Sequence, residues 1–439
     1  MTRLREVLST FDLTMIAVGG TIGSGIFLTP SLVAGQLVSP VMILGIWVLG
    51  GIVTLCGALS FAELAGMMPK AGGMYAYLSE SFGDLAGFLF GWAYLLVVNT
   101  GGIAALSLAF ATYLGYFIPL DQFSTQLTAC LGLAAVTALN IGGTKVGGLF
   151  ADFFTLLKLL GIAILIFFGL GWGSRELFAV SQEQPSLVLD FNGSFAVAMV
   201  GVLWSFGGWQ HASFATAEAK DASRSVPRAM IGGAIIVTTV YLLANVAYLL
   251  LLSPSEMGAS PRVASDAMER VLGPAGGSMI ALFIFCSTFG STGIYTLTAP
   301  RIYYAMAKDG LFFRKVAELH PRFNTPMFAI LLQSGWALVL ILFWGTFNEL
   351  ISYVVFTDWV FFGLTAAGVF VLRKKKPLAD RPYRTLGYPF TTALFVGIAL
   401  WFVINTLIEK PLQAWAGILF LAMGVPVYFF WKRRTSTPS

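Results

Sequence analysis

Long runs of apolar residues, separated by short polar connections, fill most of this chain of 439 residues. A helix that crosses the hydrocarbon core of a bilayer needs about 20 such residues, and the pattern offers about twelve runs of that kind. We therefore predict an all-α membrane protein with twelve transmembrane helices. The predicted spans cover residues 11–36, 40–66, 83–115, 124–141, 148–173, 193–217, 228–252, 275–305, 325–343, 348–371, 387–406 and 413–431.

Composition excludes an ordinary soluble protein. Hydrophobic residues make up 57% of the chain and charged residues only 11%, whereas soluble domains carry about a quarter charged residues. Glycine is abundant, with 48 residues, and in membrane bundles it permits close helix contact and interrupted helices. We predict one polytopic domain over residues 1–439, embedded in a lipid bilayer.

The basic residues are distributed unevenly between the two sides of the predicted membrane domain. Of the 26 Lys and Arg residues, 21 fall on the side that holds both termini, and Lys158 falls inside a span. The other side carries only Arg175, Arg262, Arg270 and Lys410. Because cytoplasmic loops are enriched in Lys and Arg, we expect both termini in the cytoplasm and the chain in the cell membrane. This asymmetry explains the net charge of +5 without nucleic acid as a partner.

Two predicted spans contain sequences that weaken a helix. In the first span, glycines occupy positions 19, 20, 23 and 25, and each costs a helix about 1 kcal/mol relative to alanine. The sixth span carries Ser205-Phe206-Gly207-Gly208 at its middle. Backbone groups freed inside a membrane need partners, so non-helical backbone occurs where it lines a polar cavity or is packed in protein. The alternative is that these glycines only let neighbouring helices approach closely.

The interrupted spans are the first and the sixth, which are equivalent positions in two halves of five spans each. Paired interruptions of this kind mark the central substrate site of transporters built from inverted repeats. We therefore predict a five-plus-five inverted repeat with discontinuous helices 1 and 6. Repeat one covers about 11–173, repeat two about 193–371, and helices 11–12 about 387–431. The symmetry rests on helix count and break position, because no convincing residue-level repeat accompanies it.

Broken helices offer a specific chemistry. The N-terminus of a half-helix presents unpaired N–H groups that suit a carboxylate, and unwound carbonyls suit an ammonium group or a cation. A site with both recognises the common part of an α-amino acid. The chain has two His residues and no phosphate-binding loop, HExxH or GxSxG motif with partners. We therefore predict no enzyme, no ATP-driven pump, no cofactor and no metal site.

Lys158 lies inside the otherwise apolar fifth span. It is about nine residues from the predicted cytoplasmic end, or roughly 13 Å deep, and a lysine stem of about 6 Å leaves the ammonium short of the headgroups. We expect it to face the bundle interior and pair with carbonyls or with hydroxyls of the eighth span, including Ser287 and Ser291. There it would replace a bound sodium ion and make transport sodium-independent. The alternative is a structural tether with no role in transport.

Four motifs occur in a fixed order along the chain: Gly23-Ser24-Gly25-Ile26-Phe27, Lys158, Ser205-Phe206-Gly207-Gly208-Trp209 and Arg224-Ser225-Val226-Pro227-Arg228. Together they resemble the amino acid–polyamine–organocation superfamily, and within it the bacterial members of the L-type amino acid transporter family. The first motif alone is moderately specific, whereas all four in this order are highly specific. The resemblance covers about residues 9–431.

The resemblance implies exchange of amino acids by alternating access. It implies that N–H groups of Ser24 and Gly25 hold the substrate carboxylate, and that carbonyls of Thr21, Trp204 and Gly207 take the ammonium. Trp204 would be the aromatic gate, larger than the Phe often found there, which favours small neutral substrates such as alanine, serine or cysteine. The implied substrate-binding residues are Thr21, Ile22, Gly23, Ser24, Gly25, Trp204, Ser205, Phe206 and Gly207.

Two positions depart from the family pattern. Animal members bind a heavy-chain glycoprotein through a cysteine outside the membrane, but the matching stretch here, 116–126, contains none. We therefore expect no disulfide-linked heavy chain. Asp358 stands in the tenth span where some relatives have Asn. Its carboxylate would favour cationic substrates if it lies near the pocket, and the alternative is a hydrogen-bonded structural Asp away from the site.

The sequence thus predicts a sodium-independent exchanger of neutral L-amino acids, with small ones preferred. Two alternatives stay open: proton-coupled amino acid uptake, and a receptor on the same fold that binds an amino acid without moving it. The absence of a sizeable soluble domain disfavours the receptor.

Overall fold

The computed structural model describes residues 4–37, 39–174, 193–343, 347–409 and 411–436, and these residues are helical apart from connections and one isolated bridge. The first half contains α1 (Thr10–Thr21), α2 (Gly25–Gln36), α3 (Pro40–Met67), α4 (Met74–Phe82), α5 (Asp84–Ala93), a wide π-helical turn (Tyr94–Val98), α6 (Asn99–Leu114), α7 (Gln122–Ile141) and α8 (Thr144–Trp172). The second half contains α10 (Ser194–Ser205), α11 (His211–Phe214), a 3-10 turn (Thr216–Glu218), α12 (Ala222–Leu251), α13 (Pro254–Ala259), α14 (Val263–Leu272), α15 (Pro274–Thr298), α16 (Pro300–Lys308), a 3-10 turn (Arg314–Ala317), α17 (Met327–Phe343), α18 (Phe347–Lys375), α19 (Phe390–Glu409) and α20 (Pro411–Ser436).

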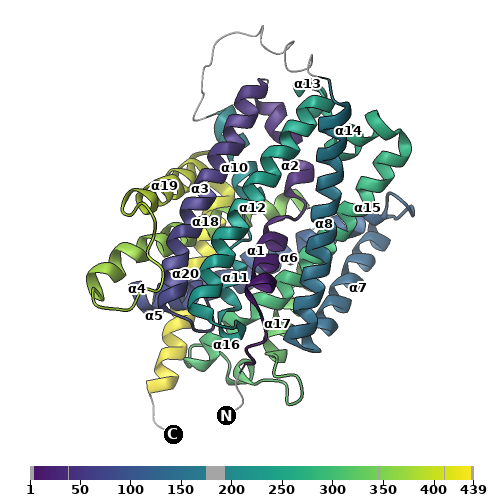
Figure 1. Cartoon of the computed structure of the whole chain (residues 1–439). Helices are drawn as coiled ribbons and strands as arrows, with labels where there is room; N and C mark the ends of the chain where they lie inside the picture. Colours follow the sequence, from purple (N-terminus) through teal and green to yellow (C-terminus); the bar gives the residue numbers. More distant parts are fainter. Residues whose placement is uncertain (1–3, 38, 175–192, 344–346, 410, 437–439) are drawn as a thin grey trace.

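The long helices form an elongated bundle, with both ends of the chain at the same end of the molecule (Figure 1). Within the described residues, nine helical segments are long and apolar enough to cross a membrane, and Ser194–Ser205 and Met327–Phe343 are shorter apolar helices. The prediction of an all-helical membrane protein is therefore confirmed. The division into twelve spans with an inverted repeat stays a prediction. Arg175 and Lys410, two of the basic residues used for orientation, lie outside the described residues.

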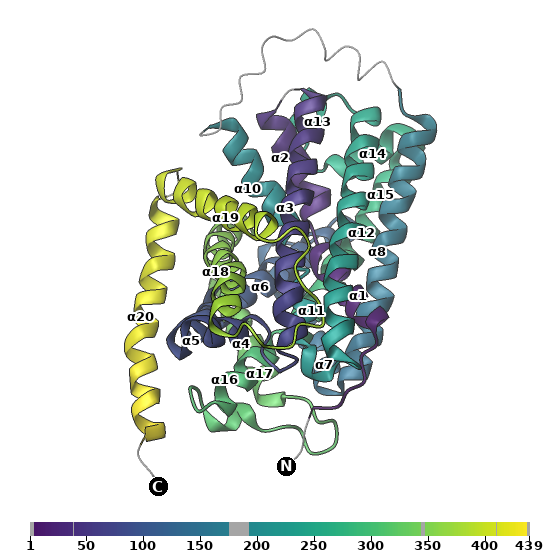
Figure 2. The same ribbon diagram turned by 60° about the vertical axis from the view of Figure 1, so that its left-hand side comes forward.

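The helix that carries the first break lies in the interior of the bundle. α1 packs against α8, α12 and α15, while α3 runs along α12. α19 and α20 lie at one side of the bundle (Figure 2), where α20 contacts α5, α18 and α19. This arrangement surrounds the glycine-rich end of α1 with protein, so its freed backbone groups meet side chains instead of lipid.

Three short helices in the connections were not predicted: α4, α13 and α14. α13 begins with Ser253 and Pro254, and the side chains and backbone of Ser253 and Glu256 form a capping box. Ser–Pro with Glu at the third helical position is a recognisable helix start. The apolar runs of the sequence do not indicate α13, because short polar helices contain no such run.

Just before α1, the chain is tied to the segment that follows α11. The N–H groups of Val7 and Leu8 both donate to the carbonyl of Glu218 at 2.9 Å, and Lys220 N–H donates to the carbonyl of Leu8 at 2.8 Å. The Glu218 carboxylate accepts from the buried Arg301 guanidinium at 2.7 Å through two nitrogens. These contacts fix the lower halves of both interrupted spans to each other at the end that holds the termini.

Candidate functional site

The first span is interrupted at the predicted position. α1 ends at Thr21 and α2 begins at Gly25. Three consecutive N–H groups at the start of α2, those of Ser24, Gly25 and Ile26, donate to no other described residue. The hydroxyl of Ser24 is also buried without a partner in the described part of the chain. Unpaired donors at a helix N-terminus form an anion site, and a carboxylate would satisfy these.

The sixth span is interrupted as well. α10 ends at Ser205, and non-helical backbone leads to the short α11. Gly208 adopts a φ of 129°, which is unfavourable for any side chain. A Cβ at Gly208 would lie only 2.3 Å from the carbonyl carbon and oxygen of Gly20. The two breaks therefore touch each other backbone to backbone, and only glycine allows this approach.

Tyr241 of α12 connects the two breaks from the side. Its hydroxyl lies 3.1 Å from the Thr21 carbonyl and 2.9 Å from the Ser205 carbonyl, the last residues of α1 and α10. The ring of Tyr241 also packs against Phe206, with 5.1 Å between ring centroids. Sequence reasoning missed Tyr241, because a tyrosine within an apolar helix gives no signal of this role.

Lys158 of α8 reaches the broken end of α1. Its side chain is fully buried, and its Nζ donates to the carbonyls of Gly19 and Ile22 at 2.8 and 2.6 Å and to Ser291 Oγ at 2.8 Å. An ammonium group has three protons, so all of them are used. The partners are the carbonyls and hydroxyls expected from the depth of Lys158 in its helix.

The two serines predicted to accompany Lys158 lie at the same place. Ser291 Oγ is 2.9 Å from the Gly19 carbonyl, and Ser287 Oγ donates to the Gly23 carbonyl at 3.1 Å. Together with Lys158 they provide donors for the carbonyls that the break sets free. This is the satisfaction of backbone groups that a broken helix in a membrane requires.

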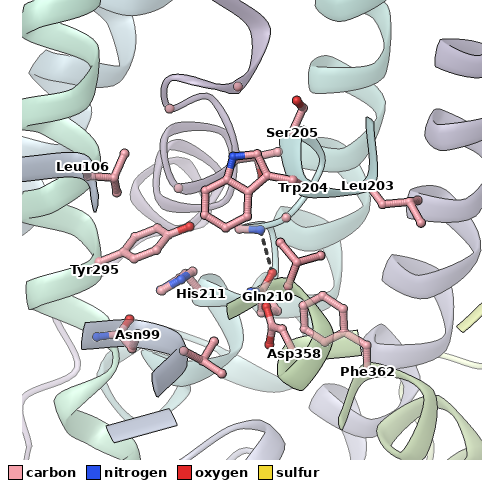
Figure 3. A pocket seen from close by; sticks show the side chains of 18 of the residues that line it. Asn99, Leu106, Leu203, Trp204, Ser205, Gln210, His211, Tyr295, Asp358 and Phe362 are labelled. Carbon is pink, nitrogen blue, oxygen red and sulfur yellow. Dashed lines mark hydrogen bonds between the residues drawn. The ribbon is translucent and has the colours of Figure 1, made fainter. Parts of the chain in front are cut away.

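A small cavity of about 40 Å³ lies between the breaks and helices α6, α15 and α18. Figure 3 shows Trp204 extending across it, with Tyr295 on one side and Phe362 on the other. Of the predicted binding residues, Ile22 and Phe206 do not line it, and neither do Lys158, Ser287 and Ser291, which lie behind the break. The lining residues are Gly20, Thr21, Gly23, Ser24, Gly25, Tyr94, Val98, Asn99, Leu106, Leu203, Trp204, Ser205, Gly207, Gly208, Gln210, His211, Tyr295, Val355, Asp358, Trp359 and Phe362.

Asp358 lines this cavity, so the hypothesis of a structural Asp away from the site is wrong. It lies with Asn99 and His211 below Trp204 in the view of Figure 3. Sequence reasoning also missed Tyr94, Gln210 and Tyr295 as lining residues, since they come from separate segments of the chain and share no motif. Among the described residues, no group of three His, Cys, Asp or Glu side chains gathers as metal ligands.

The chain is similar to known transport proteins over almost its whole length. The sequence model of a family described as "Amino acid permease" matches residues 8–431. The serine/threonine exchanger SteT of Bacillus subtilis is 33% identical over 99% of this chain and 98% of its own length. The human Asc-type amino acid transporter 1 is 33% identical over 98% of this chain and 84% of its own length. The rabbit b(0,+)-type amino acid transporter 1 is 32% identical over 100% of this chain and 91% of its own length.

Proposed function

Because the chain belongs to the amino acid permease family, we propose that it exchanges neutral L-amino acids, preferably small ones, across the cell membrane without sodium. The observation that carries this proposal is the row of free N–H groups at Ser24, Gly25 and Ile26 beside a cavity that the second break also lines. The names of the relatives, which include an exchanger of serine and threonine, support it.

In this proposal the two breaks hold the two charged ends of the substrate. The carboxylate accepts from the N–H groups of Ser24 and Gly25 at the positive end of α2. The ammonium donates to the carbonyls of Gly207 and Trp204. The Gly207 carbonyl accepts from no other described residue. The carbonyls of Trp204 and Thr21 contribute less, because each already has two donors. These are the N–H groups of Phe206 and Gly207 for Trp204, and Gly23 N–H and the Tyr241 hydroxyl for Thr21.

Lys158 takes the place of a coupling ion. Its ammonium is bound by two carbonyls and a hydroxyl, which are the oxygen ligands that a sodium ion uses at half-helix ends in related architectures. Since the positive charge is part of the chain, no sodium needs to bind before α1 and α2 hold their relative position.

Both termini lie in the cytoplasm in this proposal, because that placement puts the excess of Lys and Arg on the cytoplasmic side. Proton-coupled uptake and a receptor without transport activity are the alternatives. The exchanger and transporter names of the relatives favour movement of substrate over signalling.

Counterflow in proteoliposomes tests the proposed function. Liposomes with the purified chain and unlabelled internal alanine should accumulate labelled external alanine, equally with and without sodium. Liposomes that contain no internal amino acid should not accumulate the labelled alanine. Binding without counterflow would favour the receptor. Uptake into liposomes without internal amino acid, driven by an inward proton gradient, would favour proton coupling, and a sodium requirement would contradict the role given to Lys158.

We expect Trp204→Phe to broaden the substrate range toward larger amino acids. The indole extends across the cavity, and a smaller ring leaves space for additional methylene groups. Each methylene that a pocket accepts or rejects changes discrimination by about tenfold or more. Competition of alanine counterflow by leucine and phenylalanine measures the effect. An unchanged competition profile would contradict the assignment of Trp204 as the residue that limits substrate size.

A further inference from the structure

Besides the Ser24 hydroxyl at the first break, three polar atoms of the side chains that line the cavity have no hydrogen-bond partner in the described part of the chain. They are Asn99 Oδ1, His211 Nε2 and Asp358 Oδ1, and all three are buried. Their side chains line the cavity and lie below Trp204 in the view of Figure 3. Buried polar groups are normally paired, because an unpaired one costs about 1–3 kcal/mol. We call these three residues the acceptor cluster.

The partner of His211 fixes which of its ring nitrogens carries the proton. His211 Nδ1 is 2.6 Å from Thr298 Oγ1, and the Thr298 hydroxyl donates to the Ile294 carbonyl at 2.9 Å. Because the Thr298 proton is directed to Ile294, the proton between His211 and Thr298 belongs to Nδ1. In a neutral imidazole the other nitrogen, Nε2, is then a bare acceptor.

The orientation of Asn99 follows from the same reasoning. Gln333 Nε2 donates to the Thr296 carbonyl, which turns Gln333 Oε1 toward Asn99. Asn99 Nδ2 donates to Gln333 Oε1 at 3.1 Å. Asn99 Oδ1 is therefore the atom without a partner. The Asp358 carboxyl group keeps acceptor capacity in either protonation state, and no Lys or Arg is among the described residues that line the cavity. Asn99 Oδ1 and His211 Nε2 therefore require a donor, and Asp358 can accept from one.

A ligand that satisfies the acceptor cluster must carry its donor on a short side chain. The α-carboxylate and α-ammonium groups are taken by the breaks in the proposed function, and the cavity of about 40 Å³ leaves little further room. Among the protein amino acids, a strong donor on the first side-chain carbon is the hydroxyl of serine or threonine, whereas the thiol of cysteine donates weakly. Lysine and arginine carry their donors on long stems.

We infer that the acceptor cluster is a side-chain subsite that selects short hydroxylated L-amino acids over their apolar isosteres, with Asp358 as the residue that accepts from the hydroxyl. The inference rests on the proposed function and narrows its substrate class. It also replaces the expectation that a carboxylate at the pocket favours cationic substrates.

Threonine and valine test the inference most directly, because they have the same shape and differ by one hydroxyl. A site that pairs with a substrate hydroxyl rejects the analogue without it strongly, since its own polar groups stay unpaired. In liposomes loaded with alanine, we expect labelled threonine to enter at least about tenfold faster than valine at low concentration. Thermal stabilisation of the detergent-purified chain should likewise be larger with threonine than with valine.

Variants of Asp358 separate recognition of the hydroxyl from general damage. Asp358→Leu removes the acceptor at similar size, so the threonine-to-valine ratio should fall toward one. Asp358→Asn retains an acceptor oxygen and should keep a ratio above that of the leucine variant. Asp152→Leu is the matched control: Asp152 is also a partly buried carboxylate in a long helix with an unpaired Oδ1, but it lies outside the cavity. Its ratio should equal that of the unchanged protein.

The outcomes are distinguishable. If the unchanged protein exchanges alanine but takes valine as well as threonine, the inference is wrong and the proposed function stands. If lysine competes as strongly as threonine, the restriction to short side chains is wrong. If no amino acid gives counterflow, both proposals fail. Should Asp358→Leu not fold, the ratio in Asp358→Asn and the stabilisation of the unchanged protein by threonine and valine still decide the question.

Discussion

Replacing Lys158 with alanine is expected to reduce amino acid exchange on the order of 100-fold while the protein stays folded. The ammonium pairs with the Gly19 and Ile22 carbonyls and with Ser291. Without it, each buried carbonyl loses a donor at a cost of about 1–3 kcal/mol. These carbonyls belong to the break itself. Their loss of a donor therefore disturbs the arrangement of α1 and α2, which positions the backbone N–H groups that hold the substrate in the proposed function. Initial rates of alanine counterflow at equal protein amounts measure the effect.

Lys145→Ala is the matched control, because Lys145 is an exposed lysine near the start of the same helix. That variant should exchange alanine normally. In Lys158→Ala, the carbonyls around the vacated position form a possible sodium site, so partial recovery of exchange by sodium would strengthen the ion-replacement role. Full activity of Lys158→Ala without sodium would show that Lys158 is only a structural tether.

Gly208→Ala is expected to abolish exchange and to lower the stability of the folded protein. Two costs combine at this position. Alanine at a positive φ costs more than about 1 kcal/mol, and the added Cβ would meet the Gly20 carbonyl at 2.3 Å and Thr21 N at 2.5 Å. Backbone cannot move aside as a flexible side chain does, so the clash separates the two breaks and costs about a further 1–3 kcal/mol. Counterflow and thermal unfolding in detergent measure the two effects.

Gly143→Ala is the control that has the cost of alanine at a positive φ without the clash of the added Cβ with backbone. Gly143 has a similar φ of 139°, but a Cβ there would meet no atom within 4 Å. It should therefore lose some stability and keep most of its exchange activity. Equal behaviour of the two variants would mean that the contact between the breaks at Gly208 and Gly20 has no functional importance.

The features that the sequence predicted well are those encoded within one segment. The glycines of residues 19–25 place the first break, and the depth of Lys158 predicts an interior ammonium with carbonyl and hydroxyl partners. Ser287 and Ser291 were expected beside it because they lie in the eighth span, where their hydroxyls can meet Lys158 and the broken first helix. Such arguments need only helix periodicity and the requirement that backbone groups in a membrane be paired.

The acceptor cluster was beyond the reach of that reasoning. Asn99, His211 and Asp358 lie on α6, α11 and α18, far apart in the sequence, and each has ordinary structural explanations when considered alone. Only packing shows that they line one cavity and that each leaves an acceptor unpaired. The Tyr241 contact between the breaks escaped prediction for the same reason, since it depends on how α12 packs against α1 and α10.

The tethered ammonium of Lys158 has a consequence for energetics. Moving one elementary charge through a membrane potential of 100 mV is worth about 2.3 kcal/mol, and a carrier that binds sodium with a zwitterion gains this work in each cycle. In the proposed function the cation stays fixed to α8, and the zwitterions that cross bring no net charge. We therefore expect electroneutral exchange: voltage should neither drive nor oppose it, and the ratio of each amino acid across the membrane should follow only the ratios of its exchange partners.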